Sequence, residues 1–302
     1  MVNPNPVSPS AGFRAPLLRA LRPHQWVKNL FVVAPLVFAR RIDDIEAALR
    51  TAAAVLTFCM VSSAVYLFND LVDLDKDRAH PVKRRRPIAA GAVAPATARA
   101  AAFGLAGAAL AGAVLLGFPT LAAVVAYLVL NIAYTMVLKR IAFVDVACLS
   151  VFFLIRVLAG AAAIPVPPSS WLLACTLLLA LLLGFGKRAH ELSHAGETGE
   201  AQRDVLGHYR LSTLRRLIGT LGLLTTATYV AYTQSGHAQG FFGTRYLALT
   251  TPFVAFGIHR FVGITRRQQT AESPTDSMLR DKPFMANLIL YGVAVLLIIY
   301  LR

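Results

Sequence analysis

Long apolar stretches without charged residues recur along the chain, and most charged residues lie in the segments between them. A helix needs about 20 apolar residues to cross the hydrocarbon core of a bilayer. Residues 51–68 form one stretch of roughly that length, whereas residues 100–138 form one nearly twice as long. The longer stretch contains Gly117-Phe118-Pro119 at its middle, and these residues predict a hairpin of two helices.

The remaining apolar stretches predict further spans and a single membrane domain. We predict an all-α polytopic membrane helix bundle with nine transmembrane helices, at residues 27–39, 51–68, two within 100–138, 141–163, 171–185, 217–233, 246–258 and 284–301. The first of these is short and contains Pro35. Residues 1–12 are rich in Pro, Asn and Ser and predict a disordered tail, which leaves residues 13–302 as one transmembrane domain.

The composition supports a membrane protein. Apolar residues make up 57% of the 302 residues and charged residues 15%, against about 45–50% and about 25% in soluble domains. These values argue against a soluble enzyme and against a disordered chain, because neither could keep so much apolar surface from water. The three cysteines lie far apart inside apolar stretches, so we expect neither a disulfide nor a zinc site.

The net charge of +15 becomes informative once its placement is considered. Of the 30 Lys and Arg residues, 23 lie in the amino-terminal segment or after the second, fourth, sixth and eighth spans, and four lie on the opposite side. Cytoplasmic loops of membrane proteins carry an excess of Lys and Arg, so we predict a cytoplasmic amino terminus and an external carboxyl terminus. The same placement explains the basic composition without a nucleic-acid partner.

An acidic cluster directly follows the second predicted span. Four of the 15 acidic residues lie within residues 70–77. If the helix continues, Asn69, Asp70, Asp73 and Asp77 share one face, and Asp75 points elsewhere. Carboxylates at this spacing repel one another unless a cation lies between them, and their oxygens suit Mg²⁺, which also binds substrate phosphates. The cluster predicts a magnesium site, with a solvated acidic loop as the alternative.

A basic segment follows the acidic cluster and includes Arg78, Lys83 and Arg86. Basic residues at a membrane boundary set topology and contact lipid headgroups. We expect some of them, in addition, to close over a polyanion held by the aspartates.

These residues also carry a resemblance to a known family. The pattern Asn69-Asp70-x-x-Asp73-x-x-x-Asp77, followed by Arg78, His80-Pro81, Lys83 and Arg86-Pro87, closely resembles the first aspartate motif of the UbiA-type intramembrane prenyltransferase superfamily. Residues 22–29 and the pair Tyr134 and Lys139 extend the resemblance along the chain. It implies a helical bundle around a central cavity open to lipid, with a cytoplasmic mouth where the aspartates hold diphosphate through Mg²⁺.

The segment after the sixth span departs from the usual second aspartate motif of that family. It contains Gly186-Lys187-Arg188-x-x-Glu191, with one carboxylate and two cations, and Lys and Arg bind phosphate directly. With Arg156 in the fifth span and the segment 274–281, it resembles the decaprenyl-phosphate phosphoribosyltransferase branch. That branch transfers 5-phosphoribosyl from phosphoribosyl diphosphate (PRPP) to a polyprenyl phosphate and releases diphosphate, in a pathway that supplies cell-wall arabinan precursors.

Two alternatives to this activity stay open. The chain could transfer a polyprenyl group from its diphosphate to an aromatic or other acceptor, which the single Glu191 disfavours. A non-enzymatic transporter or scaffold is disfavoured by the aspartate cluster. If the chain is a phosphoribosyltransferase of this kind, we expect a bacterial inner-membrane enzyme with cytoplasmic active-site loops and Mg²⁺ as cofactor. Its expected partners are PRPP, polyprenyl phosphate and membrane lipids. Both a monomer and a homo-oligomer are compatible with the sequence.

The resemblance implies roles for individual residues. The expected catalytic residues are Asp73, Asp77 and Lys187, and the expected metal ligands are Asp70, Asp73 and Asp77. The expected substrate-binding residues are Lys28, Asn69, Arg78, Lys83, Arg86, Tyr134, Lys139, Arg156, Arg188 and Glu191. For Arg156 the alternative is a structural ion pair with Asp145, and for Tyr134 and Lys139 it is anchoring at the membrane interface. His190 and His194 lie one turn apart without an evident third ligand, so we expect a solvated helix face there.

Overall fold

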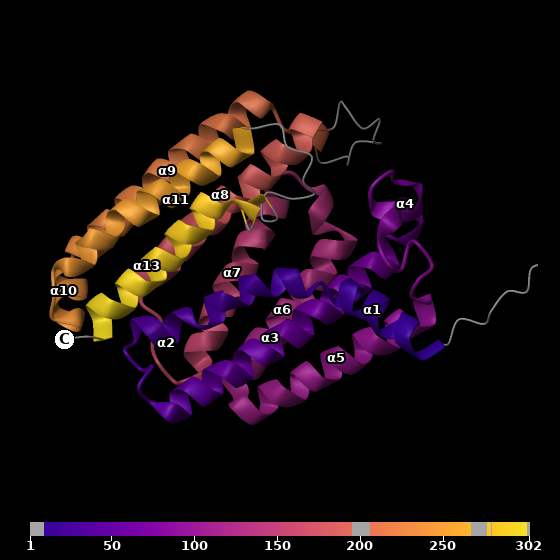
Figure 1. The fold of residues 1–302 in the computed structure, drawn as a ribbon, viewed down its shortest axis with the longest axis horizontal. Helices are drawn as coiled ribbons and strands as arrows, with labels where there is room; N and C mark the ends of the chain where they lie inside the picture. The colour runs from indigo at the N-terminus through magenta and orange to yellow at the C-terminus, as the bar shows by residue number, and fades with distance from the viewer. Residues whose placement is uncertain (1–8, 195–205, 267–276, 279, 301–302) are drawn as a thin grey trace, which may run out of the picture.

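The computed structural model describes residues 9–194, 206–266, 277–278 and 280–300, and these residues are helical or in turns, with no β-strand among them (Figure 1). The long helices are α3 (Ile45–Val72), α5 (Pro95–Leu116), α6 (Phe118–Met136), α7 (Val144–Ala163), α8 (Ser170–His194), α9 (Leu211–Gln234), α11 (Thr251–Arg266) and α13 (Lys282–Tyr300). The shorter α-helices are α1 (Pro9–Leu21), α2 (Ala34–Phe38), α4 (Leu74–Ala79) and α10 (Gly236–Phe242). The 3₁₀ helices are η1 (Pro23–Val32), η2 (Lys83–Arg85), η3 (Leu138–Arg140), η4 (Leu206–His208) and η5 (Tyr246–Thr250).

Seven helical segments of the described chain are long and apolar enough to cross a membrane: α3, α5, α6, α7, α8, the unit formed by η5 and α11, and α13. The all-helical prediction is confirmed, whereas the count of nine spans is not. The predicted span 27–39 is divided between η1 and α2. Pro35 lies inside this predicted span, in the first turn of α2, and it lacks the amide hydrogen that a helix continuous with η1 would require. Helix α9 has 24 residues but includes many threonines, and it is not among the seven.

The predicted hairpin within residues 100–138 is confirmed. Helix α5 ends at Leu116 and α6 begins at Phe118, with Gly117 between them at φ +114°. This backbone conformation is open to glycine and strained for other residues. The predicted tail at residues 1–12 lies partly outside the described residues, but α1 begins at Pro9, so the last four residues of that segment are helical.

The helices pack in two groups that meet at α7 and α8. Buried side chains of α3, α5, α6 and α7 form one core, which includes Phe58, Tyr127 and Phe152. A second core lies between α8, α9 and α11 and includes Leu182 and Phe261. Figure 1 shows α9, α11 and α13 side by side on one side of the molecule, and α3 and α5 on the other. Each group buries one face of its helices and leaves the other face outward.

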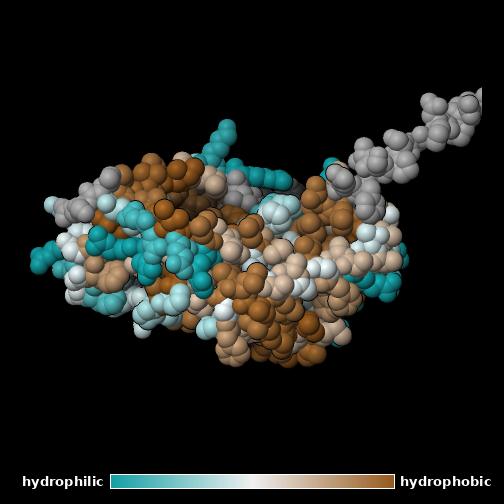
Figure 2. Space-filling view, turned by 90° about the horizontal axis from the view of Figure 1, so that it is seen from below, coloured by the Kyte–Doolittle hydropathy of each residue, from teal (hydrophilic) through white to brown (hydrophobic). Residues whose placement is uncertain are grey.

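The outward faces are apolar where lipid would contact them. Large exposed apolar side chains occur on α5, α6 and α13, and they include Phe103, Leu115, Val129 and Ile289. The face shown in Figure 2 carries extensive apolar surface, interrupted by a hydrophilic patch. An exposed apolar surface of this extent is costly in water and suits a bilayer.

Two close contacts fix the amino-terminal segment and the helix ends. Gly160 of α7 lies so near η1 that an added Cβ would stand 2.0 Å from the carbonyl oxygen of Val32, so only glycine lets η1 rest on α7. Arg50 of α3 donates to the carbonyl oxygens of Ala163 (2.6 Å) and Leu116 (2.8 Å), at the ends of α7 and α5. A cation at a helix carboxyl terminus satisfies unpaired carbonyls and the helix dipole.

Candidate active site

The aspartate motif lies where α3 ends and α4 begins. Helix α3 ends at Val72, and Asp73 is both the C-cap residue of α3 and the N-cap residue of α4. The prediction of one continuous helical face through Asp77 is therefore wrong, because the helix axis breaks at Asp73. Asp70 and Asp77 are nonetheless both buried, with 3% and 4% of their surface exposed, whereas the Asp75 side chain is 98% exposed.

Arg86 joins the two buried aspartates. Its Nη1 atom donates to Asp77 Oδ2 at 2.7 Å and to Asp70 Oδ1 at 3.2 Å. The same Asp70 oxygen accepts a hydrogen bond from Arg22 Nη2 at 2.6 Å. The other oxygen, Asp70 Oδ2, is buried and has no hydrogen-bond partner in the described structure. A buried carboxylate oxygen without a donor is costly and invites a cation or a donor from a ligand.

Asp73 and Asn69 tie the motif to the end of α6. Lys139, which follows α6 on η3, donates from Nζ to both carboxylate oxygens of Asp73 at 2.8 Å. Asn69 Oδ1 accepts from Thr135 Oγ1, also at 2.8 Å. The anchoring role considered for Lys139 is thus replaced by an ion pair inside the site.

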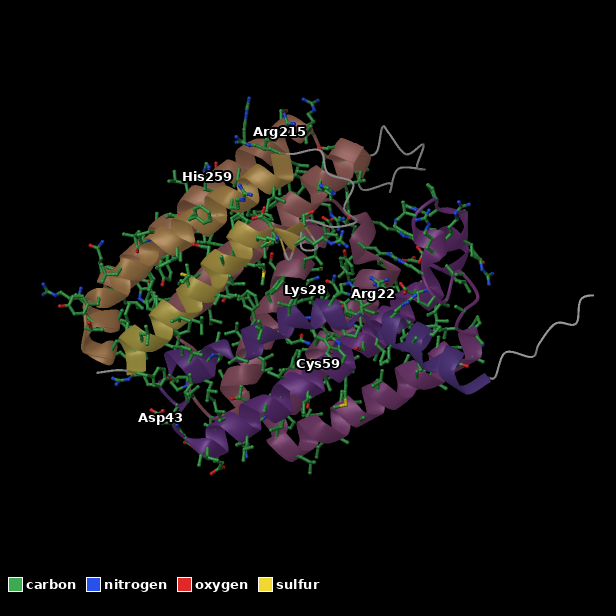
Figure 3. All side chains as sticks on the ribbon, in the orientation of Figure 1. Arg22, Lys28, Asp43, Cys59, Arg215 and His259 are labelled. Carbon is green, nitrogen blue, oxygen red and sulfur yellow. The ribbon has the colours of Figure 1, made fainter. Side chains whose placement is uncertain are left out.

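Three further basic residues expected in the site, Lys28, Arg78 and Lys83, lie at partly exposed positions. Arg78 is half exposed and pairs with Asp75 at 3.7 Å, so the structure separates it from the buried aspartates. Lys83 lies on η2 and Lys28 on η1, and both are partly exposed. Figure 3 shows Lys28 and Arg22 on the same amino-terminal segment, with Arg22 nearer α4.

The predicted metal ligands do not form one preassembled metal site. Among the described residues, no three His, Cys, Asp or Glu side chains lie close enough together to hold an ion. Asp70, Asp73 and Asp77 instead each pair with Arg or Lys. The donor set nevertheless suits Mg²⁺, since it consists of hard carboxylate oxygens beside the partnerless Asp70 Oδ2. A metal here would have to compete with the present ion pairs.

Arg156 is buried within the helix bundle among neutral partners. It donates from Nε to Asn29 Oδ1 (2.9 Å), from Nη1 to the Phe152 carbonyl (2.9 Å) and from Nη2 to the Tyr127 hydroxyl (2.8 Å). Its guanidinium also lies 4.8 Å from the centre of the Tyr127 ring. The alternative of an ion pair with Asp145 is wrong, because Asp145 pairs with a different arginine.

That arginine is Arg188, which is fully buried. It forms ion pairs with Asp145 of α7 and with Glu191 one turn along α8, and it donates to the Tyr134 hydroxyl at 3.2 Å. The structure thus brings Tyr134, Arg188 and Glu191 together, but two carboxylates already neutralise the guanidinium. Lys187, in contrast, is 38% exposed and lies 4.0 Å from Glu191.

Two members of this network lay outside the expected site. Asp145 was considered only as an alternative ion-pair partner for Arg156, and Tyr209 gave no signal in the sequence. The Tyr209 hydroxyl donates to Asp145 Oδ1 at 2.7 Å and accepts from the Phe143 amide at 2.6 Å. Burial, and then the hydrogen bond to Asp145, raise the pKa of Tyr209 above its usual value, so the phenol remains a donor. His190 is buried, so the expectation of a solvated helix face is wrong for this residue, while the side chain of His194 lies outside the described part of the structure.

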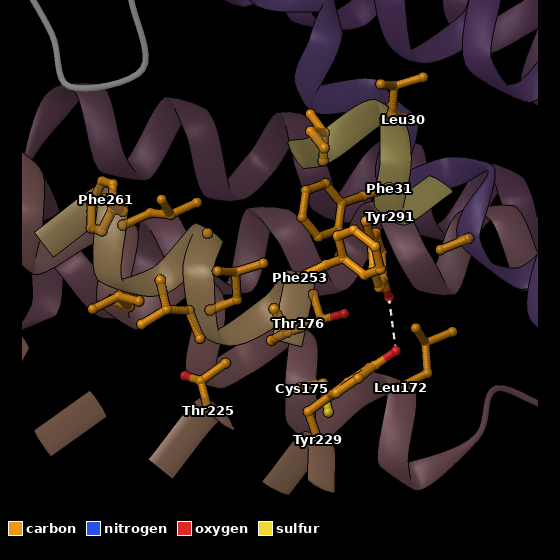
Figure 4. Close-up of a pocket in the computed structure, with 18 of the residues that line it drawn as sticks. Leu30, Phe31, Leu172, Cys175, Thr176, Thr225, Tyr229, Phe253, Phe261 and Tyr291 are labelled. Carbon is orange, nitrogen blue, oxygen red and sulfur yellow. Dashed lines mark hydrogen bonds between the residues drawn. The ribbon is translucent and has the colours of Figure 1, made fainter. Parts of the chain in front are cut away.

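A cavity of about 410 Å³ lies between η1, α8, α9, α11 and α13 (Figure 4). Its wall is almost entirely apolar and includes Leu30 and Phe31, which follow Lys28 on η1. At one place the Tyr229 and Tyr291 hydroxyls meet at 3.3 Å, drawn as the dashed line in Figure 4. The cavity accommodates a hydrocarbon chain far better than a charged group.

Comparisons with known proteins agree with this arrangement. Residues 30–288 match the model of the UbiA prenyltransferase family. The decaprenyl-phosphate phosphoribosyltransferase of Mycobacterium tuberculosis H37Rv is 36% identical over 91% of both chains, and that of Mycolicibacterium smegmatis is 38% identical over 72% of this chain and 68% of the relative. A UbiA homologue from Archaeoglobus fulgidus, solved with DMAPP and Mg²⁺, superposes with a TM-score of 0.70 at 16% identity, covering 95% of this chain and 99% of that one.

The family match covers most of the chain, and it includes the aspartate motif and most of the residues that line the apolar cavity. The structural similarity, at low identity, independently supports the same helical fold. With seven apolar helical segments among its described residues, the molecule is an integral membrane protein. From its sequence, its fold and the relatives that it matches, the chain belongs to the UbiA prenyltransferase family.

Proposed function

We propose that this enzyme transfers 5-phosphoribosyl from PRPP to decaprenyl phosphate or a similar polyprenyl phosphate, and releases diphosphate. The observation that carries the proposal is the pairing of Asp145 and Glu191 with Arg188. This end of α8 therefore presents a partly exposed cation, Lys187, beside one partly exposed carboxylate, Glu191, whereas a second metal cluster would need several accessible carboxylates. A polyprenyl monophosphate can bind such a cation directly, so the arrangement favours a monophosphate acceptor. The names of the relatives from Mycobacterium and Mycolicibacterium support the same substrates.

The aspartate motif would bind the donor. Asp70, Asp73 and Asp77 would hold Mg²⁺, which when bound neutralises charge on the leaving diphosphate. Arg86 and Lys139 form ion pairs with these carboxylates, and each can donate to phosphate oxygens. Asn69, fixed by Thr135, orients the end of α3 beside them.

The apolar cavity would bind the acceptor chain, with its phosphate toward η1 and the aspartate motif. The acceptor phosphate is already an anion, so its attack on the anomeric carbon requires no general base. Lys187 is partly exposed and would bind a substrate phosphate directly. The chemistry is then a matter of positioning two anions and stabilising the departing diphosphate.

A radiolabel assay tests the proposal. Purified protein in lipid nanodiscs is incubated with Mg²⁺, labelled PRPP and decaprenyl phosphate, and we expect label to enter the lipid fraction. Omitting decaprenyl phosphate is the control. If the protein instead consumes a labelled polyprenyl diphosphate and ignores PRPP, the alternative prenyl transfer is correct.

The predicted orientation, with a cytoplasmic amino terminus, is checked by the accessibility of tags at the two termini in sealed bacterial spheroplasts.

A further inference from the structure

Arg22 occupies an unusual position between the amino-terminal segment and the aspartate motif. Its guanidinium donates to Asp70 Oδ1 at 2.6 Å and lies 5.1 Å from the centre of the Tyr66 ring. The side chain is 24% exposed, whereas Asp70 is buried. Arg22 therefore contacts the motif from the accessible side, and no role was expected for it from the sequence.

The backbone conformation of Arg22 is energetically unfavourable for a residue with a side chain. Arg22 adopts the left-handed conformation, with φ 55° and ψ 58°, at the junction of α1 and η1. Residues with a Cβ atom rarely adopt this conformation. Pro23 then begins η1, so the junction cannot relax into one continuous helix. With this backbone conformation, the Arg22 guanidinium contacts Asp70.

The charged groups around Asp70 favour a cation that is bound to an anion over a cation alone. Asp70 Oδ1 accepts from both Arg22 and Arg86, and Asp70 Oδ2 is buried without a partner. A divalent cation alone would be repelled by two guanidinium groups. A cation bound to diphosphate would instead offer those groups new partners, since a guanidinium matches phosphate oxygens in a bidentate manner.

We infer that Arg22 is a diphosphate-binding residue that exchanges partners: it pairs with Asp70 in the free protein and moves to a phosphate oxygen when Asp70 binds the metal. This inference rests on the proposed function only in requiring a metal-bound diphosphate at the motif. It makes Arg22 an inhibitor of metal binding in the absence of diphosphate, and a contributor to diphosphate binding in its presence. The two effects have opposite signs, which distinguishes exchange from structural support.

The test measures binding, with Mn²⁺ and inorganic diphosphate as probes. Protein in nanodiscs is titrated with Mn²⁺ alone, with free Mn²⁺ read by electron paramagnetic resonance, and then with diphosphate at saturating Mn²⁺ by calorimetry. For Arg22→Gln we expect Mn²⁺ to bind about fivefold more tightly, and diphosphate about tenfold more weakly, as for loss of one charge-assisted hydrogen bond. Arg22→Lys keeps the charge, so Mn²⁺ binding should change less than about twofold while diphosphate still binds a few-fold more weakly.

Arg19→Gln is the matched control, because Arg19 is exposed one turn earlier on α1 and the variant removes the same charge. If Arg22→Gln weakens both ligands, or changes neither beyond the control, the exchange is wrong. If Arg22→Gln does not fold, as judged by thermal unfolding, Arg22→Lys decides, and unchanged diphosphate binding there overturns the inference. If the wild-type protein does not bind diphosphate even at saturating Mn²⁺, the proposed metal-bound diphosphate at the motif fails, and the inference fails with it; a failed exchange with diphosphate still bound leaves the proposed function standing.

Discussion

Lys187 and Arg188 are adjacent cations in one motif, yet the structure assigns them different consequences when each is removed. Arg188 is 0% exposed and faces Asp145, which is also 0% exposed, and Glu191, which is 23% exposed. Lys187 is 38% exposed and lies 4.0 Å from Glu191. Arg188→Met therefore leaves a fully buried carboxylate without its counter-ion, whereas Lys187→Met removes a partly solvated contact.

The expected magnitudes follow from this difference in burial. Removing one partner of a buried ion pair costs about 3–5 kcal/mol of the free energy of unfolding. We assign that cost to the Asp145 pair and little to the Glu191 pair, since solvent screens Glu191. For Lys187→Met the expected loss is below about 1 kcal/mol. The double variant Asp145→Asn with Arg188→Met should lose less than the sum of the two single variants, because the second change removes the uncompensated charge.

Unfolding in mixed micelles, titrated with sodium dodecyl sulfate and followed by tryptophan fluorescence and helical circular dichroism, measures these free energies. Equal losses for Arg188→Met and Lys187→Met would refute the assignment of Arg188 to the buried network. Additive losses in the double variant would show that Asp145 and Arg188 do not depend on each other. Either result would return Arg188 to the role expected from the sequence, a cation available to a substrate phosphate.

Three further predictions concern turnover, binding and packing. Asp73→Asn should reduce turnover in the lipid-labelling assay by roughly 10²–10³-fold. Asp75→Asn should change turnover by less than about twofold, because the Asp75 side chain is exposed. Equal losses of turnover for the two variants would contradict the different roles of Asp73 and Asp75. Lys187→Ala should raise the KM for a phosphate substrate without shifting the Mg²⁺ concentration needed for half-maximal activity, and a shifted Mg²⁺ requirement would refute this division. Gly160→Ala should lower the free energy of unfolding by about 1–3 kcal/mol, because a Cβ would meet the Val32 carbonyl, whereas Gly104→Ala, which meets nothing within 4 Å, should not.

In the aspartate motif, the sequence predicted which residues lie together but not the course of the helix. The spacing of Asp70, Asp73 and Asp77 was correctly taken to place the outer two together, and Arg86 joins them. The assumption of one straight helix was wrong at Asp73, where the chain ends α3 and starts α4. Helical periodicity describes positions along one axis and contains no information on where a polar segment will break that axis. Lys139, in contrast, was expected in the site and lies on Asp73.

The sequence by itself determined the helical membrane class, the hairpin at Gly117 and the family, because hydropathy, turn residues and motif spacing are properties of neighbouring residues. Only the tertiary structure decided which charges meet. Arg22 reaches Asp70 across 48 positions of the chain, Asp145 reaches Arg188 across 43, and Asn29 reaches Arg156 across 127. In an apolar interior each buried charge must find a hydrogen-bonding or charged partner. Which partner it finds depends on how whole helices pack. The sequence alone therefore does not distinguish a fully buried, neutralised arginine such as Arg188 from a partly exposed one such as Arg22.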